Sequence, residues 1–223
     1  MNVIKFFKID FIRSKSQSKL FPFFAILTTL MAIKFDSPIW SIFYLSFFAI
    51  ILSTTPFSMQ TISNSGFLNM LPASSYSRVA GRYLFAVFMS IIAIIFGGIS
   101  IAVSYFVNHN LPNNLASLSV LSLAVSIIAN SVQYVIFFSI GNIKSKQLMA
   151  IIQLIPAFAV FYGVSYLSDY IKAHSDAGLQ WINWSLNHLN FIALVTFILS
   201  ILTLFISLGI SNLIVCKKDY MNA

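Results

Sequence analysis

Long apolar runs, separated by short polar segments, set the pattern of this chain. Residues 37–77, 83–143 and 177–216 contain no Asp, Glu, Lys or Arg. A charged side chain at the bilayer centre costs roughly 2.5–3.5 kcal/mol on insertion scales, so uncharged runs of this length predict a protein that lies in a membrane. The runs are apolar on all sides rather than alternating, and the spans are therefore predicted to be helices and not strands.

Six segments are candidates for membrane-spanning helices, because about 20 residues of helix cross the hydrocarbon core. They are residues 20–33, 38–57, 83–107, 115–140, 148–168 and 191–216. The first is short and needs help from flanking residues. The predicted fold is an all-α polytopic membrane protein whose six-span transmembrane domain covers residues 20–223.

The basic residues fall mostly on one side of this arrangement. With the N-terminus placed inside, eleven of the thirteen Lys and Arg residues lie in inner segments, and only Lys34 and Lys172 lie outside. The positive-inside rule then predicts a multi-pass protein of the cell membrane with both termini in the cytoplasm. Orientation and the anionic inner leaflet account for the net charge of +8, so no nucleic-acid partner is expected.

The first nineteen residues combine apolar and basic side chains at helical spacing. Val3, Ile4, Phe7 and Phe11 share one face, and the lysines mostly lie elsewhere. This pattern predicts an amphipathic helix over residues 1–19 that lies among the inner lipid headgroups. The alternative is a basic anchor that only fixes the topology.

Two connecting segments carry apolar side chains. The inner connection 58–82 contains an apolar patch at 67–72, which is an expected docking site for a soluble partner; an interfacial loop resting on lipid is the alternative. The outer segment 169–190 carries Trp181 and Trp184. One or two short helices dipping into the outer leaflet are expected there, although an interfacial aromatic belt explains the tryptophans equally well.

Ionisable groups, which catalysis or ion coupling would require, are missing from the middle of the predicted spans. His109, His174 and His188 all map to outer loops and are too scattered to predict a metal site. The GxxxxGK[ST] loop of nucleotide-binding proteins is also missing. We therefore expect no bound cofactor, no ATP hydrolysis by this chain and no enzymatic activity of its own.

Neutral polar side chains follow the predicted spans in stripes. The candidates are Asn130, Gln133, Tyr134, Gln153, Thr196, Ser200, Thr203 and Ser207. Such stripes let helices approach closely and hydrogen-bond across their contact. They are also compatible with a weakly polar translocation path for an amphipathic substrate, and the sequence leaves both interpretations open.

The stretch Leu71-Pro72-Ala73-Ser74, followed by Val79 and Arg82-Tyr83-Leu84, resembles the pattern before the third span of ABC-2-type permeases. In that family this loop is the coupling helix that docks on the ATPase. The resemblance implies docking roles for the following residues: Phe67, Leu68, Met70, Leu71, Pro72, Arg78 and Arg82. The chain departs from the family where Ser63-Asn64-Ser65 replaces an acidic residue and where Ser75 replaces a basic one.

The layout also resembles the type II exporter-like architecture of this family, with six spans, an N-terminal interfacial helix, a coupling helix between spans two and three, and an outer helical hairpin between spans five and six. The resemblance implies a permease subunit that pairs with a second permease chain, alike or different, and with separate ABC ATPase subunits that hold ATP and Mg. A narrower resemblance, to permeases that export amphipathic helical peptides, implies such a peptide as the cargo.

Three other functions stay open at this point. One is an immunity permease that removes bacteriocins or other antimicrobial peptides from the membrane. Another is a membrane scaffold or sensor that transports nothing. The third is a membrane-embedded enzyme, which is disfavoured because the spans hold neither paired carboxylates nor a catalytic dyad.

Overall fold

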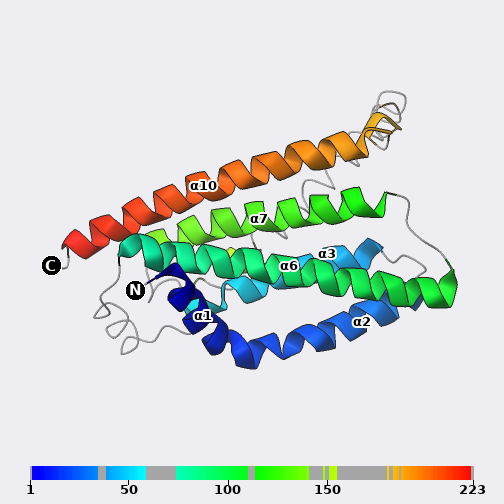
Figure 1. The fold of residues 1–223 in the computed structure, drawn as a ribbon, viewed down its shortest axis with the longest axis horizontal. Helices are drawn as coiled ribbons and strands as arrows, with labels where there is room; N and C mark the ends of the chain where they lie inside the picture. Colours follow the sequence, from blue (N-terminus) through cyan, green and yellow to red (C-terminus); the bar gives the residue numbers. More distant parts are fainter. Residues whose placement is uncertain are drawn as a thin grey trace.

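The computed structural model describes residues 2–34, 39–58, 74–109, 114–140, 148, 151–154, 180, 183–185 and 187–221. Every regular element within these ranges is a helix, which confirms the all-α part of the predicted fold. The helices, labelled in Figure 1, are α1 (Val3–Ser18), α2 (Leu20–Lys34), α3 (Ile39–Ser53), α4 (Thr55–Ser58), α6 (Ser75–Asn108), α7 (Leu115–Ile140) and α10 (Leu189–Met221).

Three helices are long and apolar enough to cross a membrane, namely α6, α7 and α10. The pair α1 and α2, bent by 67°, adds a fourth candidate if it forms one span, and the apolar stretch Ser41–Phe57 is shorter. These helices support a multi-pass membrane protein. The count of six spans stays a prediction, because most of residues 148–168 and of the outer segment 169–190 lies outside the described residues.

The third predicted span, 83–107, belongs to a longer helix, α6, which begins eight residues before it. α6 begins at Ser75, where the hydroxyl of Ser74 accepts a hydrogen bond from the backbone N–H of Ser77 at 3.2 Å. Such a cap satisfies one of the free amides of the first turn. The helix ends at Asn108, and the next residue, His109, has a left-handed φ of 55° that turns the chain away from the helix axis. Local capping, rather than the limits of the apolar run, therefore sets the bounds of this helix.

α6 lies in the middle of the described bundle. It contacts α1, α2, α3, α7 and α10, and α7 also packs along α10. Figure 1 shows α7 and α10 running in one direction and α6 in the opposite one. As a result, α1, the start of α6 and the C-terminal parts of α7 and α10 gather at one end of the bundle, which we call the α1 end.

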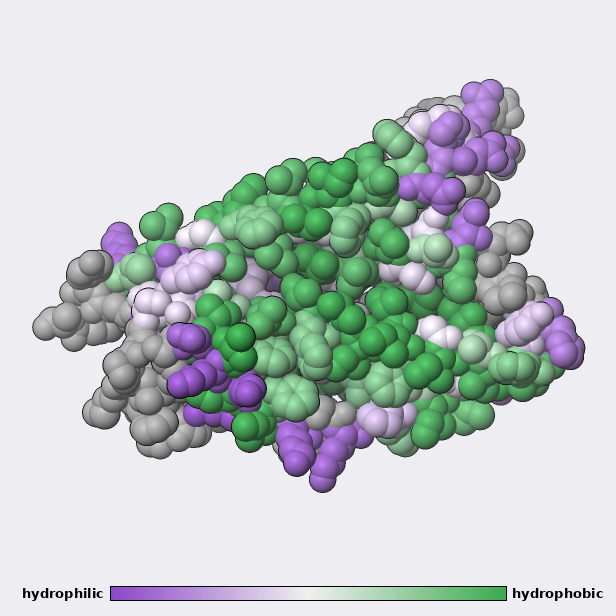
Figure 2. Space-filling view, viewed as in Figure 1, coloured by the Kyte–Doolittle hydropathy of each residue, from purple (hydrophilic) through white to green (hydrophobic). Residues whose placement is uncertain are grey.

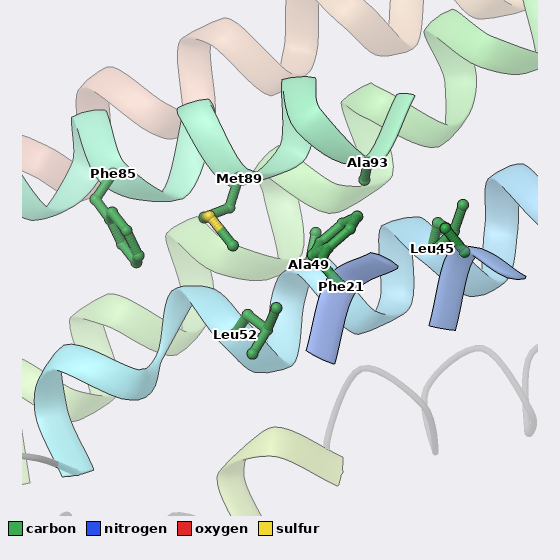
Figure 3. Packing of buried hydrophobic residues seen from close by; sticks show 8 residues of the cluster. Phe21, Leu45, Ala49, Leu52, Phe85, Met89 and Ala93 are labelled. Carbon is green, nitrogen blue, oxygen red and sulfur yellow. The ribbon is translucent and has the colours of Figure 1, made fainter. Parts of the chain in front are cut away.

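One hydrophobic cluster joins α2, α3 and α6 (Figure 3). Its members are Phe21, Ala25, Leu45, Ala49, Leu52, Phe85, Met89 and Ala93. The alanines let the helix backbones approach closely, as is usual between helices in a membrane. Gly97 of α6 marks the same close contact, because a Cβ there would lie 3.0 Å from Cγ1 of Ile42.

The outer faces of the long helices are apolar. Figure 2 shows hydrophobic residues across the middle of the molecule and hydrophilic ones toward its ends and around α1. Phe23, Ile95, Phe106 and Phe205 are all more than half exposed. A soluble protein does not expose apolar side chains in a continuous band of this kind, so this surface fits a surrounding of lipid.

Candidate functional site

The coupling segment is the inner connection 58–82, and most of it, residues 59–73, lies outside the described residues. The helix ends on both sides of residues 59–73 are described. Phe57, at the end of α4, and Tyr83, near the start of α6, belong to one buried cluster. The other members are Val79, Ala86, Tyr134, Phe137 and Ile152. Both flanks of the segment are thus held against α7 and the short helical stretch 151–154.

A buried ion pair fastens α1 to α6 in the same region. Nε of Arg82 lies 3.9 Å from Oδ2 of Asp10, and both side chains are almost entirely buried. The Arg82 guanidinium also lies 4.3 Å from the ring centroid of Phe57 and 5.5 Å from that of Phe138. A cation is stabilised over aromatic faces at such distances. Arg82 therefore links α1, α4 and α7 to the beginning of α6.

The helix contact that surrounds this ion pair is unusually close. A Cβ built on Gly81 would lie 2.6 Å from Cβ of Phe6 and 3.1 Å from the carbonyl oxygen of Val3. Only glycine leaves room for α1 at this position. The hydroxyls of Ser14 and Thr55 share a hydrogen bond of 2.7 Å that ties α1 to α4 as well.

The α1 end also contains a break between α3 and α4. The Tyr134 hydroxyl of α7 donates to the carbonyl oxygen of Ser53 at 2.6 Å. Nε2 of Gln153 donates to Oγ1 of Thr54 at 2.5 Å. These two side chains, both named as candidates from the sequence, therefore supply hydrogen bonds to the broken end of α3.

Asn130 and Gln133 lie next to this break. The Ser53 hydroxyl donates to Oδ1 of Asn130 at 2.5 Å, and Nε2 of Gln133 donates to the carbonyl oxygen of Ile152 at 3.1 Å. Nδ2 of Asn130, Oγ of Ser131 and Oε1 of Gln133 are buried and have no hydrogen-bond partner. Three unpaired polar atoms within about one helical turn of an apolar bundle are costly, since each loses its hydration.

The polar stripe of α10 divides into two parts. Ser207 hydrogen-bonds to the Tyr83 hydroxyl and donates to the carbonyl oxygen of Ser131 at 2.6 Å, so it joins α6, α7 and α10. Thr196, Ser200 and Thr203 lie farther along α10 and donate to carbonyl oxygens of their own helix, at 2.7 to 2.9 Å. Only Ser207 of these four candidates meets the cluster at the α1 end.

The remaining docking candidates are only partly described. Phe67, Leu68, Met70, Leu71 and Pro72 lie outside the described residues, and their docking role stays a prediction. Arg78 is half-buried in the second turn of α6. The guanidinium of Arg82 points into the bundle, toward Asp10 and the two aromatic rings, and is not presented on the surface.

The described residues hold no group of three His, Cys, Asp or Glu side chains that could bind a metal ion. What the α1 end contains instead is an ion pair, neutral hydroxyls and amides, and packed aromatic rings. These groups connect six helices, namely α1, α3, α4, α6, α7 and α10. The geometry therefore suits the transmission of movement between a flanking segment and the bundle.

Comparison with protein families identifies a match that spans most of the chain. The model of a family described as ABC-2 family transporter protein matches residues 5–216, which is nearly the whole chain. No curated protein and no solved structure matches. The match covers α1 through α10, including the cluster at the α1 end. The chain therefore belongs to the ABC-2 family of transporter proteins.

Proposed function

We propose that this protein is the membrane-spanning permease subunit of an ATP-driven ABC exporter. Membership of the ABC-2 family supports a partnership with an ABC ATPase subunit. The observation that carries the proposal is the cluster at the α1 end, where Phe57 and Tyr83 hold both flanks of residues 59–73 to α7. ATP and Mg are bound by the ATPase, and a second permease chain, identical or different, completes the path.

In this proposal residues 67–82 form the coupling helix and the turns that follow it. The ATPase docks there on the cytoplasmic side, which also holds both termini. When ATP draws the ATPase subunits together, the docked segment moves. Phe57 passes that movement to α3 and Tyr83 passes it to α6, because each is packed in the same buried cluster.

We infer that the cargo is an amphipathic peptide of the phenol-soluble modulin kind. The chain resembles a permease subunit of the staphylococcal exporter of these peptides. Between Tyr83 and Asn108 in α6, and throughout α7, the helices carry hydroxyls and amides but no Asp, Glu, Lys or Arg. Neutral polar groups among apolar ones match a peptide with one apolar face, whereas a charged substrate would require paired ions.

Replacing Leu71 by Asp is expected to weaken binding of the ATPase roughly tenfold or more, because an apolar side chain that anchors a docked surface contributes about 1.5–3 kcal/mol. The measurement is the affinity of the purified ATPase for the permease in lipid nanodiscs. The matched control is Asn142→Asp, which adds the same charge to the inner connection between the fourth and fifth predicted spans and should bind normally. Equal binding by Leu71→Asp and the wild type would contradict the docking assignment.

A peptide panel tests the cargo. An amphipathic helical peptide is expected to stimulate ATP hydrolysis by the assembled transporter, and a scrambled peptide of equal composition is expected not to. Export of a peptide made inside the cell supports the exporter. Protection against peptides added outside, without export, supports the alternative of an immunity permease. Equal stimulation by the helical and the scrambled peptide would show that the transporter does not recognise an amphipathic helix.

A further inference from the structure

The break between α3 and α4 follows from one proline. α3 ends at Ser53 and α4 begins at Thr55. Pro56 has no N–H, so it cannot donate to the carbonyl of Leu52, four residues earlier. The next amide, of Phe57, bonds to the carbonyl oxygen of Thr54 at 3.0 Å and not to that of Ser53. The carbonyl of Ser53 therefore has no partner within its own helix.

A free carbonyl inside an apolar bundle needs a donor from elsewhere. Tyr134 supplies one at 2.6 Å, from a side chain that is fully buried. The ring of Tyr134 also lies edge-on to Phe57 and to Tyr83, with centroids 5.1 Å apart in both cases. This one tyrosine thus contacts the broken end of α3 and the two residues that flank the coupling segment.

A second donor stands beside the first. The amide of Asn130 already meets Ser53, because Oδ1 accepts from the Ser53 hydroxyl at 2.5 Å, yet Nδ2 of the same amide is buried and unpaired. Asn130 and Tyr134 are four residues apart on α7, so they lie on one face of that helix. Beside the hydroxyl of Tyr134, α7 therefore holds a second buried donor whose own amide contacts Ser53, and this donor makes no hydrogen bond in the conformation described.

We propose that the α3–α4 break is a hinge, that Tyr134 is the positioning residue that holds it in the conformation described, and that Nδ2 of Asn130 is the donor that takes over the Ser53 carbonyl when the hinge moves. Closely packed helices do not deform continuously, so movement at one end changes them between discrete arrangements. Here the two arrangements differ in the hydrogen-bond donor to the Ser53 carbonyl. The inference rests on the proposed function only in taking residues 59–73 as the segment that drives the hinge.

The hinge can be tested on the isolated permease in detergent. Tyr134→Phe keeps the ring and removes the donor, so hydrogen exchange of the peptide that covers residues 50–58 should become roughly fivefold faster or more, the effect of leaving one buried carbonyl unpaired. Exchange in α10 should not change. The control is Tyr105→Phe, which removes a hydroxyl at the other end of α6. Unchanged exchange at 50–58 in Tyr134→Phe would overturn the hinge.

Pro56→Ala tests the hinge in the other direction. It restores the N–H and allows a continuous helix through the break, so exchange at 50–58 should slow, while the ATPase still binds and peptide-stimulated hydrolysis falls. Faster or equal exchange at 50–58 contradicts the hinge. Asn130→Leu removes the second donor and should lower stimulated hydrolysis; normal stimulation excludes Asn130 as the second donor.

The two proposals fail in different ways. If the ATPase does not bind the wild-type permease, the proposed function is wrong, and the link between hinge and coupling segment is lost with it. If the ATPase binds and is stimulated normally by all three variants, the proposed function stands and the hinge has no role in transport. The exchange experiment needs no ATPase, so it decides on the hinge itself in either case.

Discussion

Replacing Asp10 by Ala is expected to lower the free energy of unfolding by about 3 kcal/mol. The substitution leaves the Arg82 guanidinium buried without its counter-ion, and breaking a buried ion pair from one side costs about 3–5 kcal/mol. We expect the lower end of this range, because the 3.9 Å between Nε and Oδ2 exceeds a hydrogen bond and two aromatic rings still face the cation. Denaturant unfolding of the purified permease in mixed micelles measures the change.

The matched control is Lys8→Ala, two residues away on the exposed side of α1. An exposed charge of this kind changes stability by only about 0.5 kcal/mol or less. A double-mutant cycle with Asp10→Asn and Arg82→Gln then isolates the pair, since the two changes together should cost less than their sum. Additive effects would mean that Asp10 and Arg82 stabilise the protein independently of each other.

The long helices were predictable because one physical property marks them. Residues 115–140 form an uncharged apolar run, and α7 has the same bounds. The apolar character of a run does not indicate which helices pack against each other. Asp10 and Arg82 are far apart in the sequence, and only the packing of α1 against α6 brings them together. The available signal was weak: Asp10 is the one acidic residue before Asp36, within a strongly basic segment.

The break in α3 was missed for a related reason. The uncharged run continues through Ser53, Thr54 and Pro56, so the sequence predicts a single uninterrupted span over residues 38–57. A proline near the end of an apolar run does not say whether the helix kinks, stops or starts again. That outcome depends on whether neighbours can satisfy the carbonyls left free at the break, and here Tyr134 of α7 donates to that of Ser53.

The polar candidates show where sequence reasoning stops. Amides and hydroxyls are costly in lipid, which is why the sequence predicts that such side chains face protein or a path. The candidates considered at this point are Asn130, Gln133, Tyr134, Gln153 and Ser207. The pattern could not decide between a helix contact and a translocation path. The structure places all five in contacts between segments. A path along Thr196, Ser200 and Thr203 stays a prediction, because it depends on a second permease chain.

Movement of the coupling segment can reach α1 through α6, provided that α1 is packed tightly against α6. Two kinds of contact seat it: the ion pair of Asp10, and the space left by Gly81. The aromatic contacts of Phe7 and Phe11 with Phe88 add apolar packing to them. These contacts act at the same few turns of α6 that follow the coupling segment, so the proposed role of α1 is to move with that segment rather than to anchor the chain passively.

Replacing Gly81 by Ala is therefore expected to separate α1 from α6. The new Cβ would lie 2.6 Å from Cβ of Phe6 and 3.2 Å from the backbone nitrogen of Phe7. Neither atom can move without the helix that carries it, and such overpacking costs about 1–3 kcal/mol. We expect lower stability together with faster proteolysis or hydrogen exchange within α1.

Gly98→Ala provides the matched control on the same helix. No atom lies within 4 Å of a Cβ built on Gly98, and Ala is favoured over Gly inside a helix by about 1 kcal/mol. This second variant should therefore be as stable as the wild type or slightly more stable, with unchanged exchange in α1. Equal behaviour of the two variants would show that α1 does not need the space at Gly81. If Gly81→Ala loosens α1 but leaves peptide-stimulated ATP hydrolysis intact, α1 is a membrane anchor and takes no part in coupling.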